Sequence, residues 1–176
     1  MILGVVLAGG NSTRFGSDKA LAELGGHTLL NRAFDTLTGF CELVVIAGRA
    51  QGPGHCIPDW PRPQMGPLAG IAAALRLARD EGYDSVLSCG VDSVNLPESL
   101  LELLSPAPAY VESQPVVGHW PAGTVDALEA LLLSEERHSM LAFAEAIGAR
   151  PVKIGAKPAN INTPADLTAA EKNHGI

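Results

Sequence analysis

The sequence is poor in cysteine and in positive charge. Its three cysteines, Cys41, Cys56 and Cys89, are odd in number and lack CxxC spacing, which argues against a disulfide framework or a thiolate zinc site. Lysine and arginine total 12 against 19 aspartate and glutamate residues, so the formal net charge is −7. Because an excess of carboxylates repels nucleic acid and anionic membrane surfaces, neither is an expected partner.

Long apolar runs are also missing. No run reaches the ~20 apolar residues that a membrane-spanning helix requires. The chain opens on strand-like residues, without the basic segment and long apolar stretch of a secretion signal. We therefore expect a cytoplasmic protein. Of the 176 residues 47% are hydrophobic, which predicts a single compact domain over residues 1–176.

Short apolar runs alternate with segments of helical periodicity. Strands are predicted at Ile2–Leu7, Leu43–Ala47 and Ser85–Ser88, which are apolar on both faces and suit a parallel sheet covered by helices. Helices are predicted at Leu29–Leu37, Leu68–Arg79, Pro97–Leu104, Thr124–Leu133, Ser139–Ile147 and Pro164–Lys172. This order predicts an α/β fold, a three-layer Rossmann-like sandwich with a mostly parallel sheet.

Two proline-rich stretches, Gly52–Pro67 and Pro106–Pro121, interrupt this alternation. The second includes a segment that resembles a short hairpin, Tyr110–Gly118. Neither stretch indicates a domain boundary.

Glycine is concentrated after the first predicted strand, in "LAGGNSTRFGSDKALAEL" (Leu7–Leu24). Glycines let several backbone N–H groups turn toward one anion, and Arg14 and Lys19 add positive charge at the same place. Phosphate is therefore the expected ligand. An ordinary tight turn is the alternative, although this loop stays polar through Asp18. The pattern is neither GxGxxG nor GxxxxGK[ST], which disfavours dinucleotide dehydrogenases and P-loop NTPases.

These residues carry a family resemblance. Leu7-Ala-Gly-Gly, Arg14-Phe-Gly and Asp18-Lys19 resemble the signature of nucleotidyltransferases with the nucleotide-diphospho-sugar transferase fold, most closely the molybdenum cofactor guanylyltransferases. Three further segments are similar to that family and occur in its order. They are "PDWPRPQMGPLAGI" (Pro58–Ile71), "SCGVDSVNLP" (Ser88–Pro97) and "NINTPADL" (Asn160–Leu167).

Asp92 follows a buried strand at the edge where the glycine loop opens. Its carboxylate suits a magnesium ion that bridges phosphate oxygens, which is also the role that the resemblance implies. The alternative is a cap for the helix near Pro97. The family usually has a proline where this chain has Val94, which leaves the conformation of the segment open.

Asp59 stands among prolines, where its two acceptor oxygens suit the N1–H and amino donors of guanine. The resemblance implies the same role and places Gly66 and the residues after it close to the base. A solvated loop carboxylate is the alternative. Gly48 and Arg49 occupy the region where the family usually offers an asparagine to the ribose, so sugar contacts stay open.

Asn160 and Asn162 alternate with Ile161 and therefore point to the same side of the chain. The resemblance places them at the metal and phosphate end of the site. In the same motif Thr163 is expected to cap the following helix, with Asp166 at its third position. His119 lies where a second substrate would be accepted, although a histidine beside a tryptophan is more often a packed structural pair.

The motifs and the resemblance together give a list of expected site residues. The nucleotide would be bound by Leu7, Ala8, Gly9, Gly10, Lys19, Asp59, Gly66 and Asp92. Catalysis would depend on Lys19, Arg14 and Asp92, metal binding on Asp92 and Asn162, and acceptor binding on His119 and Asn160.

The resemblance implies transfer of GMP from GTP to the phosphate of molybdenum-bound molybdopterin, with release of pyrophosphate. It implies Mg²⁺ as the cofactor and GTP and a molybdopterin-type cofactor as partners, and it leaves open transient contacts with molybdenum cofactor insertion or target proteins. A phosphate monoester is already anionic near neutral pH, so no protein nucleophile is needed. Catalysis then consists of aligning two anions and neutralising their charge.

Two alternatives stay open at this level. One is a related enzyme with another nucleotide or acceptor, such as a molybdopterin cytidylyltransferase or a transferase for sugar phosphates or phospholactate. The other is a noncatalytic nucleotide-binding protein, which the unusual Val94 and Gly48 favour. Lys19, Asp92 and Asn162 argue against the second, because binding alone would not require all three.

Overall fold

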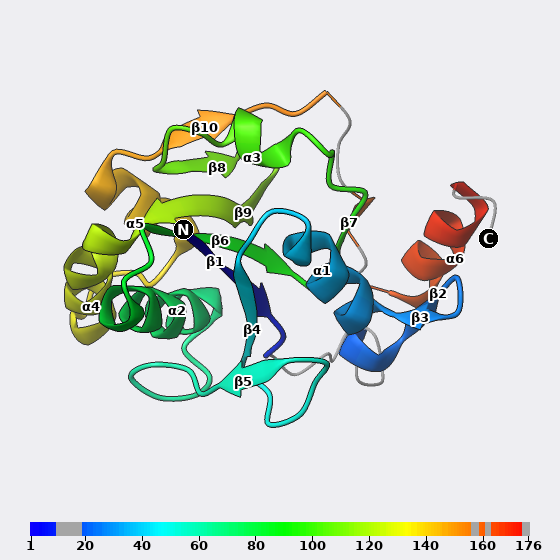
Figure 1. Ribbon diagram of the computed structural model, residues 1–176, viewed down its shortest axis with the longest axis horizontal. Helices are drawn as coiled ribbons and strands as arrows, with labels where there is room; N and C mark the ends of the chain where they lie inside the picture. The colour runs from blue at the N-terminus through cyan, green and yellow to red at the C-terminus, as the bar shows by residue number, and fades with distance from the viewer. Residues whose placement is uncertain (10–18, 156–158, 161–162, 174–176) are drawn as a thin grey trace.

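The computed structural model describes residues 1–9, 19–155, 159–160 and 163–173 (Figure 1). Its central element is a seven-stranded sheet in the order β10-β8-β9-β6-β1-β4-β5. The strands are β1 (Ile2–Leu7), β4 (Leu43–Ala47), β5 (His55–Ile57), β6 (Ser85–Gly90), β8 (Ala109–Val111), β9 (Gln114–Pro121) and β10 (Arg150–Val152). Strand β9 runs antiparallel to both of its neighbours, and the other neighbouring pairs are parallel. The predicted mostly parallel α/β sheet is confirmed.

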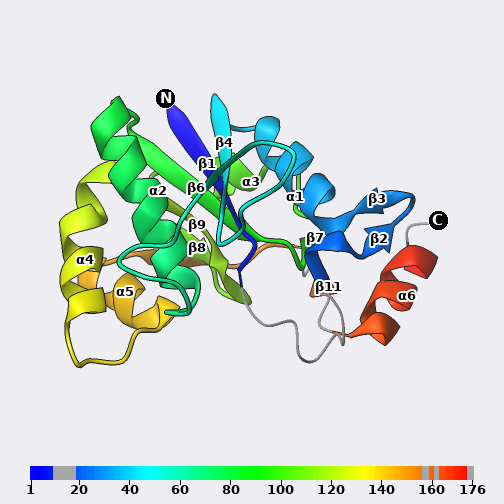
Figure 2. The same ribbon diagram turned by 90° about the horizontal axis from the view of Figure 1, so that it is seen from below.

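Helices cover both faces of this sheet (Figure 2). On one face α1 (Leu29–Thr38) and α3 (Leu100–Leu103) contribute to one apolar core. On the other face α2 (Pro67–Glu81), α4 (Val125–Leu133) and α5 (Met140–Ile147) contribute to a second core. The helix predicted at Leu68–Arg79 is confirmed within α2, and helical periodicity places its apolar residues on the side that faces the sheet, where they are buried.

Side-chain caps fix where several helices begin. The hydroxyl of Thr28 accepts a hydrogen bond from the Asn31 N–H at the start of α1, and Ser139 does the same for α5. At the start of α6 (Pro164–Asn173), Thr163 and Asp166 bond reciprocally, each side chain accepting from the other's backbone N–H. The predicted cap is thus confirmed, as a capping box.

The proline-rich stretches hold more structure than their sequences indicate. The first contains β5, and the second forms β8 and the whole of β9. Their pairing of Tyr110 with Gly118 confirms the hairpin. The helix predicted over 97–104 is shorter, Leu100–Leu103, because Pro97 and the residues after it form a turn first.

Short elements lie beyond the carboxyl edge of the main sheet. They are the 3-10 turn η1 (Lys19–Leu21), the pair β2 (Glu23–Leu24) and β3 (His27–Thr28), and the pair β7 (Ser93–Val94) and β11 (Ala159–Asn160). Helix α6 lies beside β2 at the same end of the molecule (Figures 1 and 2). Within the described part of the chain, no helix is long and apolar enough to cross a membrane.

Candidate active site

Three parallel strands end at the same level. Leu7 at the end of β1 pairs with Ala47 at the end of β4 and with Gly90 at the end of β6. The segments that follow these strands therefore meet at one edge of the sheet, where open α/β sheets bind their ligands. The Ala8 N–H donates to the Ala47 carbonyl at 2.9 Å, which ties the start of the glycine loop to the neighbouring strand.

Two of these segments touch through their backbones. Gly48 has a φ of +87°, and a Cβ atom added there would lie 2.7 Å from both the Cα and the N of Gly9. Only glycine fits this combination of conformation and contact. Position 48 therefore has no room for a side chain.

Lys19 and Asp92 meet after β6. Lys19 lies in η1, and its Nζ is 3.3 Å from Oδ2 of Asp92, with 19% and 24% of the two side chains exposed. A Cβ atom at Gly90 would lie only 2.6 Å from Oδ1 of Asp92, so the glycine leaves the space in which that carboxylate sits. The sequence analysis missed Gly90, although a glycine that ends a buried strand is a usable signal for such a close approach.

Asp59 lies in the connection between β5 and α2. Cβ atoms added at Gly9 and Gly70 would lie 3.9 and 3.6 Å from its carboxylate oxygens, so the carboxylate faces both backbones. Burial of this half-buried group raises the pKa of Asp59. Gly66, with a φ of +78°, precedes Pro67 at the start of α2. The carboxylate of Asp59 therefore lies between Gly9 and the first turn of α2.

The C-terminal motif reaches the same region through backbone pairing. Asn160 in β11 pairs with Ser93 in β7, the residue after Asp92, and Ala159 pairs with Val94. The unusual Val94 is thus part of a strand. Within the described residues the buried Ser93 hydroxyl has no hydrogen-bond partner. Gly10, Arg14 and Asn162 lie outside the described residues.

His119 lies elsewhere. Its side chain is buried on β9, with Nε2 2.7 Å from the Ser85 hydroxyl and Nδ1 3.1 Å from the Leu104 carbonyl. Ser85 begins β6, at the edge opposite to the one where Asp92 lies. Burial lowers the pKa of His119, which keeps the imidazole neutral. We therefore remove His119 from the acceptor residues, since its ring nitrogens are already satisfied inside the fold.

Most of the described candidates thus converge. Leu7, Ala8, Gly9, Lys19, Asp59 and Asp92 meet at the carboxyl edge of the sheet, with Gly66 at the start of the adjoining helix and the Asn160 backbone beside Ser93. No group of three or more histidine, cysteine, aspartate or glutamate side chains suited to a metal occurs among the residues described. The edge therefore offers single carboxylates and bare backbone.

Comparisons with known proteins show the family of the chain. Residues 4–151 match the MobA-like NTP transferase domain. A molybdenum cofactor guanylyltransferase from Acidiphilium cryptum is 36% identical, with 95% of this chain and 92% of that protein covered. The protein of the same name from Rhodobacter capsulatus is also 36% identical, with 97% and 95% covered.

A solved structure shares the fold. Molybdopterin-guanine dinucleotide biosynthesis protein A from Archaeoglobus fulgidus superposes with a TM-score of 0.77 over 98% of both chains, at 22% identity. Together with the sequence relatives, whose alignments span nearly the whole chain, this settles the classification. The chain belongs to the MobA-like NTP transferase family and is similar to molybdenum cofactor guanylyltransferases.

Proposed function

We propose that this chain transfers GMP from GTP to the phosphate of molybdenum-bound molybdopterin and releases pyrophosphate. The observation that carries the proposal is the arrangement of two carboxylates at the carboxyl end of β1. Asp59 faces the backbone of Gly9 on one side, and the Lys19 and Asp92 pair lies where β1 and β6 end on the other. A nucleoside triphosphate fits this arrangement with its base toward Asp59 and its phosphates toward Lys19.

Asp59 supports the choice of guanine. An ionised carboxylate only accepts hydrogen bonds, and guanine presents two adjacent donors, N1–H and the amino group. Because the carboxylate is half buried against Gly9 and Gly70, water competes with the base less than it would on an open surface. Cytosine and adenine offer no matching pair of donors, so the same group disfavours them.

Enzymes of this kind generally use a divalent metal, and the residues around Asp92 fit Mg²⁺. Magnesium typically takes one or two carboxylates and completes its shell with water and substrate phosphates. Asp92 is such a carboxylate, and Gly90 leaves the space in which its Oδ1 lies. Asn162 is the second proposed ligand. When bound, the metal would neutralise charge on the triphosphate oxygens.

The chain's own residues bind and orient two anions. An oxygen of the molybdopterin phosphate forms a bond to the α-phosphorus of GTP, and the bond from that phosphorus to the pyrophosphate oxygen breaks. The electron pair leaves with pyrophosphate, so no side chain has to act as the nucleophile. Lys19, with Arg14 and the N–H groups that include Gly10, stabilises the charge that accumulates. Asn160 is the residue that we propose to contact the acceptor, molybdenum-bound molybdopterin.

The test is turnover with each nucleotide. The purified chain is incubated with Mg²⁺ and GTP, ATP, CTP or UTP, with and without molybdenum-bound molybdopterin, and both pyrophosphate and the dinucleotide product are measured. We expect product from GTP, only when the acceptor is present. A preference for CTP would replace the guanine assignment with a cytidylyltransferase, and binding without turnover for any nucleotide would support the noncatalytic alternative.

Asp59→Asn tests the base assignment within the same assay. The substitution replaces one acceptor by a donor, and such a mismatch typically costs ~1–3 kcal/mol. GTP use should fall about fivefold to a hundredfold, at ~1.4 kcal/mol per tenfold change, while ATP and CTP should change little. Asp35→Asn is the matched control, because Asp35 is exposed on α1. Equal losses for all nucleotides would mean that Asp59 supports the loop instead.

A further inference from the structure

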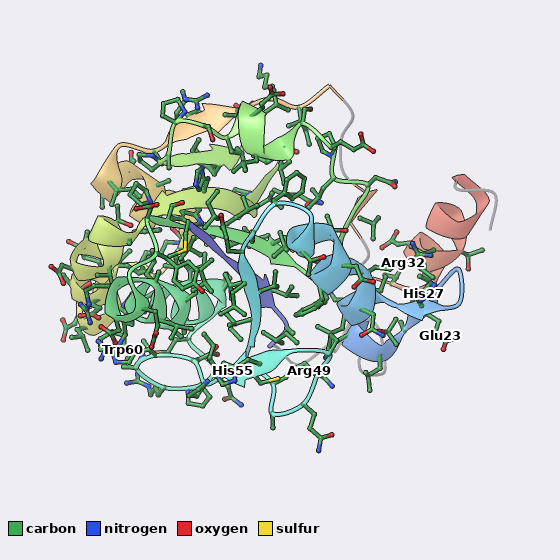
Figure 3. All side chains as sticks on the ribbon, in the orientation of Figure 1. Glu23, His27, Arg32, Arg49, His55 and Trp60 are labelled. Carbon is green, nitrogen blue, oxygen red and sulfur yellow. The ribbon has the colours of Figure 1, made fainter. Side chains whose placement is uncertain are left out.

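The loop that carries Asp59 is attached to α2 at two places. The Trp60 N–H donates to the Ala69 carbonyl in the first turn of α2 at 3.1 Å. Farther along the helix, the Arg76 guanidinium carbon lies 4.7 Å from the centroid of the Trp60 ring, a cation–π contact. Ala69 and Arg76 are seven residues apart and therefore share one face of the helix. Figure 3 shows Trp60 beside α2, on the side toward α4.

Arg76 is itself held by the neighbouring helix. Its Nη1 donates to Oε1 of Glu129 in α4 at 2.5 Å. Both side chains are largely covered, with 35% of Arg76 and 20% of Glu129 exposed. Helices α2 and α4 lie side by side in both views (Figures 1 and 2). The guanidinium is thus fixed between a carboxylate on one helix and an aromatic face on the loop.

We propose that Arg76 is a positioning residue for base selection. Held by Glu129, it fixes the Trp60 ring, and this orients the carboxylate of Asp59, the adjacent residue in the chain. The proposal rests on the proposed function, because it assigns Arg76 to the step in which Asp59 reads the base. Arg76 touches neither Asp59 nor any other group at the carboxyl edge in the described contacts, so it acts through Trp60.

The geometry distinguishes this role from helix packing alone. Arg79 lies one turn farther along α2 and also reaches toward α4, where its Nη1 is 3.7 Å from Oδ1 of Asp126. Its second ion pair is with Asp80 on its own helix, at 3.3 Å. Arg79 thus joins the same two helices with the same charge, and its described contacts do not include Trp60. A comparison of variants at Arg76 and Arg79 therefore distinguishes an effect on the Trp60 loop from an effect on the packing of α2 against α4.

The experiment compares Arg76→Met with Arg79→Met. For each variant the ratio of kcat/KM for GTP to kcat/KM for ATP is measured, together with the thermal midpoint. We expect Arg76→Met to lower this ratio about threefold to tenfold, mainly through KM for GTP, since a lost cation–π contact has that order of effect. Arg79→Met should leave the ratio unchanged. An unchanged ratio in Arg76→Met, or equal losses for GTP and ATP, would overturn the inference.

Variants of Trp60 supply a rescue test. Trp60→Phe keeps an aromatic face for the guanidinium and should keep most of the GTP preference, whereas Trp60→Leu should lose it. If Arg76→Met does not fold, Arg76→Lys is used instead, because it keeps the charge but removes the planar guanidinium. The same decrease in the ratio of kcat/KM for GTP to kcat/KM for ATP is expected. Retention of the full ratio in both Trp60→Leu and Arg76→Lys would also overturn the proposal.

The Asp59→Asn variant distinguishes a failure of the positioning role of Arg76 from a failure of the proposed function. If Asp59→Asn narrows the GTP preference and Arg76→Met does not, the positioning role of Arg76 is wrong and the proposed function stands. If the wild-type chain shows no GTP preference, or Asp59→Asn leaves it intact, the assignment of Asp59 fails first. Both outcomes are measured in one panel of nucleotides.

Discussion

Replacement of Gly48 by alanine should destabilise the protein more than its backbone conformation alone explains. Gly48 has a φ of +87°, a region in which an L-residue costs about 1–2 kcal/mol. A Cβ atom there would also lie 2.7 Å from two backbone atoms of Gly9, which cannot rotate away as a side chain can. We therefore expect Gly48→Ala to lower the free energy of unfolding by about 2–4 kcal/mol.

Two other glycines supply matched controls. Gly82 ends α2 with a φ of +82° and has no other atom within 4 Å of an added Cβ, so Gly82→Ala reports the conformational cost alone. Gly9→Ala would place its Cβ 3.5 Å from the Gly48 Cα, an ordinary contact, and should be nearly neutral for stability. The contact is therefore asymmetric: alanine is tolerated on one side of it and not on the other.

Urea unfolding of the three variants and the wild type measures the differences in the free energy of unfolding. Thermal unfolding is the second measurement. At ~2–4 °C per kcal/mol for a chain of this size, the thermal midpoint should fall by a few degrees in Gly82→Ala and by at least twice as much in Gly48→Ala. Affinity for GTP should fall in Gly48→Ala and stay unchanged in Gly82→Ala. Equal unfolding free energies for Gly48→Ala and Gly82→Ala would refute the close contact between Gly48 and Gly9.

Three further predictions concern charged groups. Lys19→Met should lower kcat/KM for pyrophosphate release about a hundredfold. Because the ion pair with Asp92 is largely covered, the substitution should also lower the unfolding free energy, so urea unfolding is measured beside the kinetics, and an unchanged kcat/KM would contradict the role of Lys19. Burial raises the pKa of Asp59, so the preference for GTP over ATP should decline on acidification at a higher pH than an ordinary aspartate would give, in kinetics measured across the acid range. Burial lowers the pKa of His119, so its contribution to stability is complete above the ordinary histidine value of about 6.5 and is lost as the pH falls below it. In urea unfolding, the free energy of unfolding of His119→Gln should therefore decrease less steeply than that of the wild type as the pH falls below about 6.5.

Much of the fold could be predicted from local sequence pattern. The strands at Ile2–Leu7 and Leu43–Ala47 have the boundaries that their apolar runs indicate, and the capping residue Thr163 occupies the predicted position. In the second proline-rich stretch only the hairpin could be predicted, and the bounds of its two strands could not, because proline weakens the strand signal. The pairing of Ser93 with Asn160 depends on segments far apart in the chain, which no local pattern records.

The candidate site could be predicted only where the order of the strands determines which residues meet. Residues that directly follow parallel strands must meet at one edge, so Gly9 and Asp92 could be placed together from the order of the elements. The contact of Gly48 with Gly9 could not, because it depends on the register between β1 and β4. The contact of Arg76 with Trp60 depends on the path of a loop between two elements.

The placement of the two carboxylates suggests why an acidic chain can handle anionic substrates. Asp59 is set by the β5–α2 loop and by α2, whereas Asp92 is set by the end of β6 and by Lys19, so the two are positioned by different elements. The net charge of −7 disfavours phosphate at long range, but screening limits that effect to about 10 Å in ordinary salt. Within that distance we expect Lys19 and the backbone N–H groups at the carboxyl edge of the sheet to determine the attraction for phosphate. Substitutions in the β5–α2 loop should therefore alter the choice of base while leaving the charge stabilisation at Lys19 and Asp92 intact.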